Sequence, residues 1–234
     1  MNKKDFNICI NLNFSSLNIS AFNKQDNKNV FSKNYNFKES IDNDEIDFQE
    51  IKLFFQNEIF KIEKMMDYFL DDIYLMIDTE KSFSINLSLI NDLDNRLLDK
   101  KDVLYLVENA KQQISASYFD LKIIHILITD YVIDKVNYDY LPKNINCKKL
   151  SLNIKFICMP KKLIINLEKI FIKNQLSIKR IICTRYVKSI FNEDDNICNS
   201  GMKIINGFNL NEVIMVPKKR QTKGFFEHLF HLFR

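Results

Sequence analysis

Glycine is scarce in this chain of 234 residues. Three glycines are present, Gly201, Gly207 and Gly224, so the first 200 residues contain none. A loop that cradles a phosphate group needs glycine, because a Cβ atom would block the close approach of the backbone. The sequence therefore excludes a Walker loop and a glycine-rich dinucleotide-binding turn.

Tryptophan is absent, and the cysteines are odd in number. None of the five lies in a C-x-x-C motif; they are Cys9, Cys147, Cys158, Cys183 and Cys198. This usage is typical of reduced thiols in a cytosolic protein and indicates neither a disulfide framework nor a zinc site. The start, MNKKDFNICINLNF, is broken by polar residues, so we expect no signal peptide. No stretch has the length that a transmembrane helix requires.

A surplus of positive charge exists at one end of the chain. The whole sequence has 34 basic and 30 acidic residues, and the segment from Lys218 onward contains five basic residues and one acidic residue. The remaining body has 29 residues of each sign. Because a nucleic-acid-binding surface is basic, we expect the body to bind no nucleic acid.

The last seventeen residues, KKRQTKGFFEHLFHLFR, combine a basic flank with an aromatic amphipathic pattern. At 3.6 residues per turn the apolar side chains fall on one face, which is typical of a helix lying in the headgroup layer of an anionic membrane. The predicted membrane-binding residues are Lys218, Lys219, Arg220, Lys223, Phe225, Phe226, Leu229, Phe230, Leu232 and Phe233. The alternative is that this helix packs against its own domain.

The body shows alternating and helical hydrophobic patterns in a mixed order. Strands are predicted at 6–12, 16–22, near 30–31, 73–77, 82–90, 122–128, 131–137, 150–158, 178–183 and 212–216. Helices are predicted from Ile46 to Phe69, after Asp99, and from Pro160. Apart from its one strand, the segment 192–217 is expected to be irregular.

The order of these elements resembles that of the FtsA family of bacterial cell-division proteins, which are actin-like. The resemblance runs from about Asp72 to Phe191 and rests on collinear stretches. These are DIYLMID, DKKDVLYLVENAKQQ, KIIHILITDYVIDKVNYDYLPKNI, LSLNIKFICMPKKLIINLEKIF and LSIKRIICTRYVKSIF. FtsA is also similar in ending with a basic linker and an amphipathic membrane-targeting helix.

The resemblance implies an α+β chain: an α/β actin-like half-domain, a β-α-β-β insert subdomain and a C-terminal amphipathic helix. The implied parts are a first actin-like part (1–79), the insert (80–159), a return helix and strand (160–191), a linker (192–217) and the membrane-targeting tail (218–234). In the family, the insert contacts neighbouring protomers and other division proteins.

The sequence departs from the family at its nucleotide site. Actin-like proteins carry Asp and Gly in the first hairpin turn, where this chain reads Asn11-Leu12-Asn13-Phe14. The second phosphate loop of the family is glycine-rich, whereas few glycines follow Phe191 here. The chain is also too short for the family's second half, which docks the tubulin-like protein FtsZ. We therefore expect no ATP, magnesium or other cofactor and do not carry over FtsZ binding.

These observations predict a non-enzymatic, membrane-tethered adaptor in bacterial cell division, with no catalytic and no metal-binding residues. Its expected partners are anionic membrane lipids, together with divisome proteins or FtsA-like protomers that contact residues 80–159. The expected location is the cytoplasmic side of the cell membrane, with midcell as the site of action. His125, set among isoleucines, is expected to be a core histidine. Two alternatives stay open: an actin-like ATPase that still binds ATP, and a PilM-like pilus-assembly component.

Overall fold

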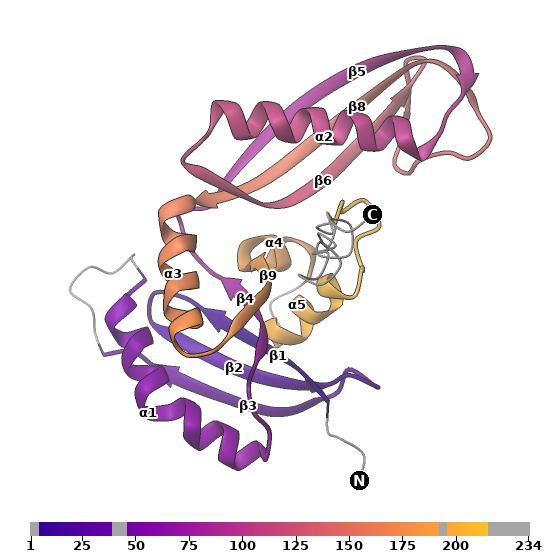
Figure 1. The fold of residues 1–234 in the computed structure, drawn as a ribbon. Coiled ribbons are helices and arrows are strands. Elements are labelled where there is room, and N and C mark those ends of the chain that lie inside the picture. The colour runs from indigo at the N-terminus through magenta and orange to yellow at the C-terminus, as the bar shows by residue number, and fades with distance from the viewer. Residues whose placement is uncertain (1–4, 39–45, 192–195, 215–234) are drawn as a thin grey trace, which may run out of the picture.

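The computed structural model describes residues 5–38, 46–191 and 196–214. Within these ranges the chain forms two β-sheets and five helices, so the predicted α+β class is confirmed (Figure 1). The first sheet has the strand order β3-β2-β1-β4-β9. Its strands are β1 (Phe6–Leu12), β2 (Ser16–Asn23), β3 (Asn29–Asn36), β4 (Asp72–Ile77) and β9 (Ser177–Cys183). The first three strands are antiparallel, whereas β1, β4 and β9 are parallel.

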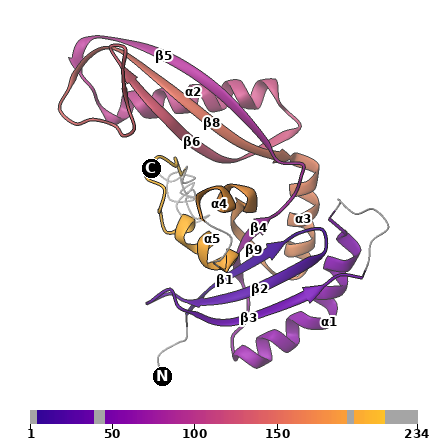
Figure 2. The same ribbon diagram turned by 180° about the vertical axis from the view of Figure 1, so that it is seen from behind.

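Helices cover both faces of the first sheet. Helices α1 (Phe48–Met66) and α3 (Lys161–Lys173) lie on one face, and α4 (Thr184–Ile190) and α5 (Ile197–Ile205) lie on the other (Figures 1 and 2). Burial on both faces explains why β1 is buried at consecutive positions, Ile8, Cys9 and Ile10. The two helices of the first face meet through Phe55 and Phe171, whose ring centroids are 5.0 Å apart.

The second sheet is inserted between β4 and α3. It has the order β5-β8-β6-β7 and is antiparallel throughout. Its strands are β5 (Phe83–Leu97), β6 (Leu121–Ile133), β7 (Val136–Tyr138) and β8 (Asn146–Pro160). Helix α2 (Lys100–Ser117) packs on one face and encloses a separate hydrophobic core. It begins as predicted at Asp99, which forms a capping box with Asp102.

Some predicted boundaries were wrong. Helix α1 ends at Met66, so Phe69 lies beyond it and is exposed. Strand β5 runs to Leu97, seven residues past the predicted end, with a register shift between Asp92 and Arg96. The two strands predicted at 122–128 and 131–137 are largely one continuous strand, β6.

The segment after Phe191 was predicted to be irregular, but it contains helix α5. Gly201 allows this helix to lie close to β4, since a Cβ atom at this position would stand 2.4 Å from Sδ of Met76. The strand predicted at 212–216 is reduced, within the described residues, to one antiparallel bridge between Glu212 and Leu127. No helix in the described ranges is long and apolar enough to cross a membrane.

Candidate functional site

The predicted membrane-binding residues, from Lys218 to Phe233, lie outside the described residues. The structure therefore bears on two other places: the edge of the first sheet, where an actin-like protein would hold its nucleotide, and the junction between the two sheets.

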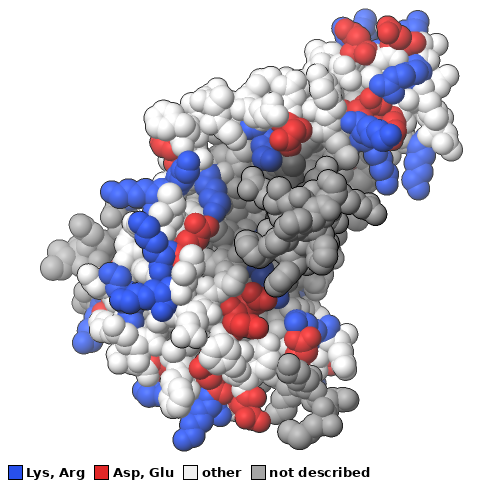
Figure 3. Space-filling model, viewed as in Figure 1, with Lys and Arg blue, Asp and Glu red and all other residues white. Residues whose placement is uncertain are grey.

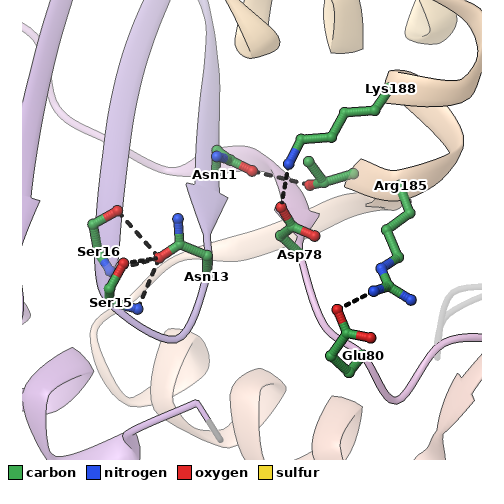
Figure 4. Close-up of polar contacts among 9 residues, drawn as sticks. Asn11, Asn13, Ser15, Ser16, Asp78, Glu80, Arg185 and Lys188 are labelled. Atoms are coloured by element: carbon green, nitrogen blue, oxygen red, sulfur yellow. Dashed lines mark hydrogen bonds and ion pairs between the residues drawn. The ribbon is translucent and has the colours of Figure 1, made fainter. Parts of the chain in front are cut away.

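The carboxyl ends of β1, β4 and β9 meet at one edge because these strands are parallel. In α/β sheets, ligands bind beyond this edge. Polar residues near the ends of these three strands and in the segments that follow them come together there (Figure 4). They are Asn11, Asn13, Ser15, Ser16, Asp78, Glu80, Thr184, Arg185 and Lys188.

The β1–β2 turn is closed by its own side chain. The Oδ1 atom of Asn13 accepts hydrogen bonds from the backbone N–H groups of Ser15 and Ser16, at 2.8 and 2.6 Å. It also accepts from their hydroxyl groups, at 3.1 and 3.2 Å. A phosphate-binding turn presents its N–H groups to the ligand. In this turn, two such groups already have an internal acceptor.

The acidic residues that follow β4 are paired with cations from α4. The Nζ atom of Lys188 lies 2.7 Å from Oδ2 of Asp78, and Arg185 forms an ion pair with Glu80. Beside them, the hydroxyl group of Thr184 donates to Oδ1 of Asn11 at 3.0 Å. A nucleotide-bound metal ion is held by free carboxylate oxygens. Here one oxygen of each carboxylate pairs with an ammonium or a guanidinium group, and the side chain at Asn11 is a neutral amide.

A buried polar cluster joins the two sheets, and we call it the junction cluster. It consists of His125 on β6, Arg180 on β9, Tyr186 on α4, and Asn209 and Glu212 in the segment after α5. Glu212 accepts a hydrogen bond from His125 and another, 3.3 Å long, from the Tyr186 hydroxyl. It also forms an ion pair with Arg180. Its side chain is 3% exposed, so these contacts replace the water that its carboxylate loses on folding.

The protonation state of His125 follows from its two partners. The backbone N–H of Cys183 donates to Nε2 at 2.9 Å, so Nε2 carries no proton. The proton of the neutral ring is therefore on Nδ1, which donates to Oε1 of Glu212 at 2.7 Å. Burial lowers the pKa of His125, against the opposing effect of the Glu212 carboxylate. The expectation of a satisfied core histidine is thus confirmed.

Glu212 itself stays ionised. Burial by itself would raise the pKa of Glu212, but the hydrogen bond from His125 and the charge of Arg180 outweigh it and lower that pKa. Sequence reasoning missed this residue, because its partners His125 and Arg180 are 87 and 32 positions away in the chain.

The same segment extends the second sheet. The N–H of Ile128 donates to the carbonyl of Asn211 at 3.0 Å, and the N–H of Val213 donates to the carbonyl of Ile126 at 2.8 Å. Residues 211–213 thus pair with β6 where β7 does not reach it. One edge of the second sheet is covered in this way, partly by β7 and partly by this segment.

The opposite edge of the second sheet is formed by β5. In both ribbon views β5 is the strand farthest from the first sheet (Figures 1 and 2). Among the described residues, no strand pairs with its outer edge. Lysine or arginine and aspartate or glutamate are interspersed at the far end of this sheet (Figure 3), so that end has no uniform charge.

Comparisons with known proteins give fold-level likenesses. No protein-family model matches the sequence, and no curated protein matches it. Among solved structures, the cytoplasmic domain of EpsL, an inner membrane component of the type II secretion system of Vibrio cholerae, matches with a TM-score of 0.40 and 6% identity over 78% of this chain and 59% of its own. A PilM–PilN type IV pilus biogenesis complex matches with a TM-score of 0.49 and 5% identity over 80% of this chain and 50% of its own.

A third match is a Bacteroides thetaiotaomicron protein of unknown function with an actin-like ATPase fold. Its TM-score is 0.36 and its identity 13%, over 80% of this chain and 56% of its own. The chain thus spans between half and three fifths of these structures. None of these three proteins is an FtsA by name. Of what the sequence resemblance implied, the structure confirms the architecture: an α+β fold with a second sheet inserted between β4 and α3.

Proposed function

We propose that this chain is a non-enzymatic adaptor of the FtsA type in bacterial cell division. Its tail, from Lys218 to Phe233, tethers it to anionic lipids on the cytoplasmic side of the membrane. Residues 80–159, which contain most of the second sheet, contact divisome proteins or related protomers.

One observation carries the non-enzymatic part of this proposal: polar groups at the strand ends of the first sheet are paired with one another. Asn13 accepts two N–H groups of the turn, and Lys188 pairs with Asp78. A nucleotide with its metal ion would have to break these contacts and would still meet no glycine in the turn. This arrangement favours an adaptor over an actin-like ATPase.

The membrane part is tested by localisation in cells. We would compare three proteins, each fused to a fluorescent protein. They are the full chain, a variant ending at Gln221, and a variant of full length with Phe226→Asp and Phe230→Asp. The proposal expects a midcell membrane signal for the full chain and a diffuse signal for both variants. A diffuse signal from the full chain as well would contradict the membrane anchor. A tail-dependent but uniform membrane signal would retain the anchor and contradict the division role.

The alternatives have their own readouts. Titration of the full chain with ATP and Mg²⁺ in a calorimeter should give no binding heat, and a saturable signal would favour the ATPase. The PilM-like alternative predicts that the gene lies among pilus-assembly genes, whereas the division adaptor predicts division and cell-wall genes beside it.

A further inference from the structure

The outer edge of β5 is the least protected sheet edge in the described part of the chain. From Phe83 to Asn91 its sequence is FSINLSLIN, with no charged residue, no proline and no glycine. Natural edge strands are normally short, bulged or charged, because unpaired N–H and C=O groups recruit other strands. The register shift of β5 falls beyond Asp92, so it leaves this nine-residue stretch regular.

Other edges in the described ranges do have such protection. The covered edge of the second sheet ends in the three-residue β7 and in residues 211–213. On the first sheet, β3 carries Lys33, paired with Glu58, and β9 carries Lys179 and Arg180. The uncharged stretch of β5 therefore differs from the edges around it.

The two faces of this stretch differ in chemistry. Ile85, Leu87 and Leu89 point toward α2 and are only partly buried, since they lie at the margin of the second core. Between them, Asn86 and Ser88 are exposed on the opposite face. A strand added at this edge would complete the burial of the first set and extend the polar face with the second.

The stretch is complementary to itself in the antiparallel direction. With Leu87 facing Leu87 of a second copy, Ile85 faces Leu89 of that copy, and Asn86 faces its Ser88. Residues directly opposite one another in an antiparallel pair lie on the same face of the sheet. From Ile85 to Leu89, apolar residues therefore meet apolar residues beside α2, and small polar residues meet on the open face. At the two ends of the stretch the match is lost, since Phe83 faces Asn91 and Ser84 faces Ile90.

We infer that the β5 edge binds a second copy of this chain, forming a two-fold symmetric, continuous sheet from the two second sheets. Such an interface is isologous, and both α2 helices lie on the same side of it. The position of β5 at the extremity of the molecule keeps the first sheets apart on opposite sides of the axis (Figure 1). Dimerisation through this edge also doubles the number of membrane tails per particle, which strengthens membrane attachment by avidity.

The inference names a partner for the interaction module of the proposed function, on which it rests, but its test measures self-association alone. Its failure therefore leaves the localisation experiment unaffected, and failure of the localisation experiment leaves the dimer intact. Because pairing of one edge strand with its copy makes a small interface, we expect a weak dimer. Sedimentation velocity should therefore be run on the full chain up to about 100 μM. The inference predicts a monomer–dimer equilibrium over that range.

Charge variants test the register. In Asn86→Asp/Ser88→Asp, each new carboxylate faces a carboxylate of the second copy, and the dimer dissociation constant should rise by at least about tenfold. In Asn86→Asp/Ser88→Lys, opposite charges face one another, and dimerisation should return. In both variants the carboxylate that replaces the amide of Asn86 lies opposite Lys155 on β8 of the same chain. Both variants also remove the hydrogen bond that Ser88 donates to Asn153 on β8, so circular dichroism of each variant checks that the fold is retained.

The matched control places the same charges on another edge strand. Asn34→Asp/Asn36→Asp alters two exposed asparagines of β3 and should leave the dissociation constant unchanged. A wild-type chain that stays monomeric at the highest concentration overturns the inference. So does equal weakening by both β5 variants, or weakening by the β3 control, since neither result depends on the two-fold register.

Discussion

His125 and Glu212 connect the second sheet to the segment after α5, with Nδ1 of the histidine 2.7 Å from Oε1 of the glutamate. The histidine is neutral and the glutamate ionised, and Arg180 on β9 compensates the buried charge. Three separate parts of the chain thus depend on one carboxylate.

Removing that carboxylate should destabilise the protein. Glu212→Ala leaves Arg180 without its partner and Nδ1 of His125 without an acceptor, so we expect the free energy of unfolding to fall by about 3 kcal/mol. Urea denaturation followed by circular dichroism measures this loss. The matched control is Glu80→Ala at the exposed ion pair with Arg185, where the loss should stay below about 1 kcal/mol. Equal losses in the two variants would contradict the role given to the junction cluster.

The junction cluster should also make stability depend on pH. The pKa of His125 is lowered in the folded state, so its stabilising effect is complete above the ordinary value of about 6.5 and is lost as the pH falls below that value. The lowered pKa of Glu212 acts in the same direction at more acidic pH. Between about pH 6.5 and pH 5 we expect the free energy of unfolding to decrease by up to about 1.4 kcal/mol per pH unit for the histidine proton.

The control for this pH dependence is His125→Gln, whose amide does not titrate. The variant is expected to be less stable at neutral pH but to have a flatter stability profile between about pH 6.5 and pH 5. If the free energy of unfolding of this variant depended on pH as steeply as that of the wild type, another group would be taking up the proton, and the prediction would be wrong.

Gly201 should tolerate alanine only if its neighbour is made smaller. The added Cβ atom would collide with Met76, whereas alanine favours the helix over glycine by about 1 kcal/mol. We therefore expect Gly201→Ala to destabilise the wild type and to stabilise a Met76→Ala background. A double-mutant cycle by urea denaturation measures this coupling, and additive effects would contradict the close approach of α5 to β4.

Asn13 should be required for the β1–β2 turn rather than for a ligand. Asn13→Ala removes the acceptor of two backbone N–H groups, and we expect a loss of about 1–2 kcal/mol. Asn13→Asp retains the acceptor and should cost much less. Thermal unfolding of the two variants checks this, and similar melting temperatures for both would show that the side-chain oxygen is not what the turn needs.

The elements with strong local patterns were predictable from the sequence. Strand β1 has the predicted bounds, and β2 and the start of α2 lie within a residue of them, because alternating burial and the Asp99 capping box are local signals. Helix α5 was missed, since its nine residues give a short pattern and its packing depends on the contact of Gly201 with Met76.

The contacts at the candidate site were not predictable from the sequence, although its unusual composition was visible there. The missing glycines and the amide at Asn11 are visible in the sequence, and they indicated that the turn is unsuited to phosphate. Lys188 and Asp78 are 110 positions apart in the chain, and no local sequence pattern predicts a contact at that separation. For the same reason, His125 was recognised as a core residue while its partner Glu212 was not.

The pairing of residues 211–213 with β6 has a mechanical consequence. Any pull on the chain beyond Ile214 loads the backbone hydrogen bonds to Ile126 and Ile128, and the side chain of Glu212, before it reaches α5. Because Glu212 is held from both sheets, the load divides between them at this point. If the chain were pulled from this side, the force would therefore act first at the junction of the two sheets and not on α5.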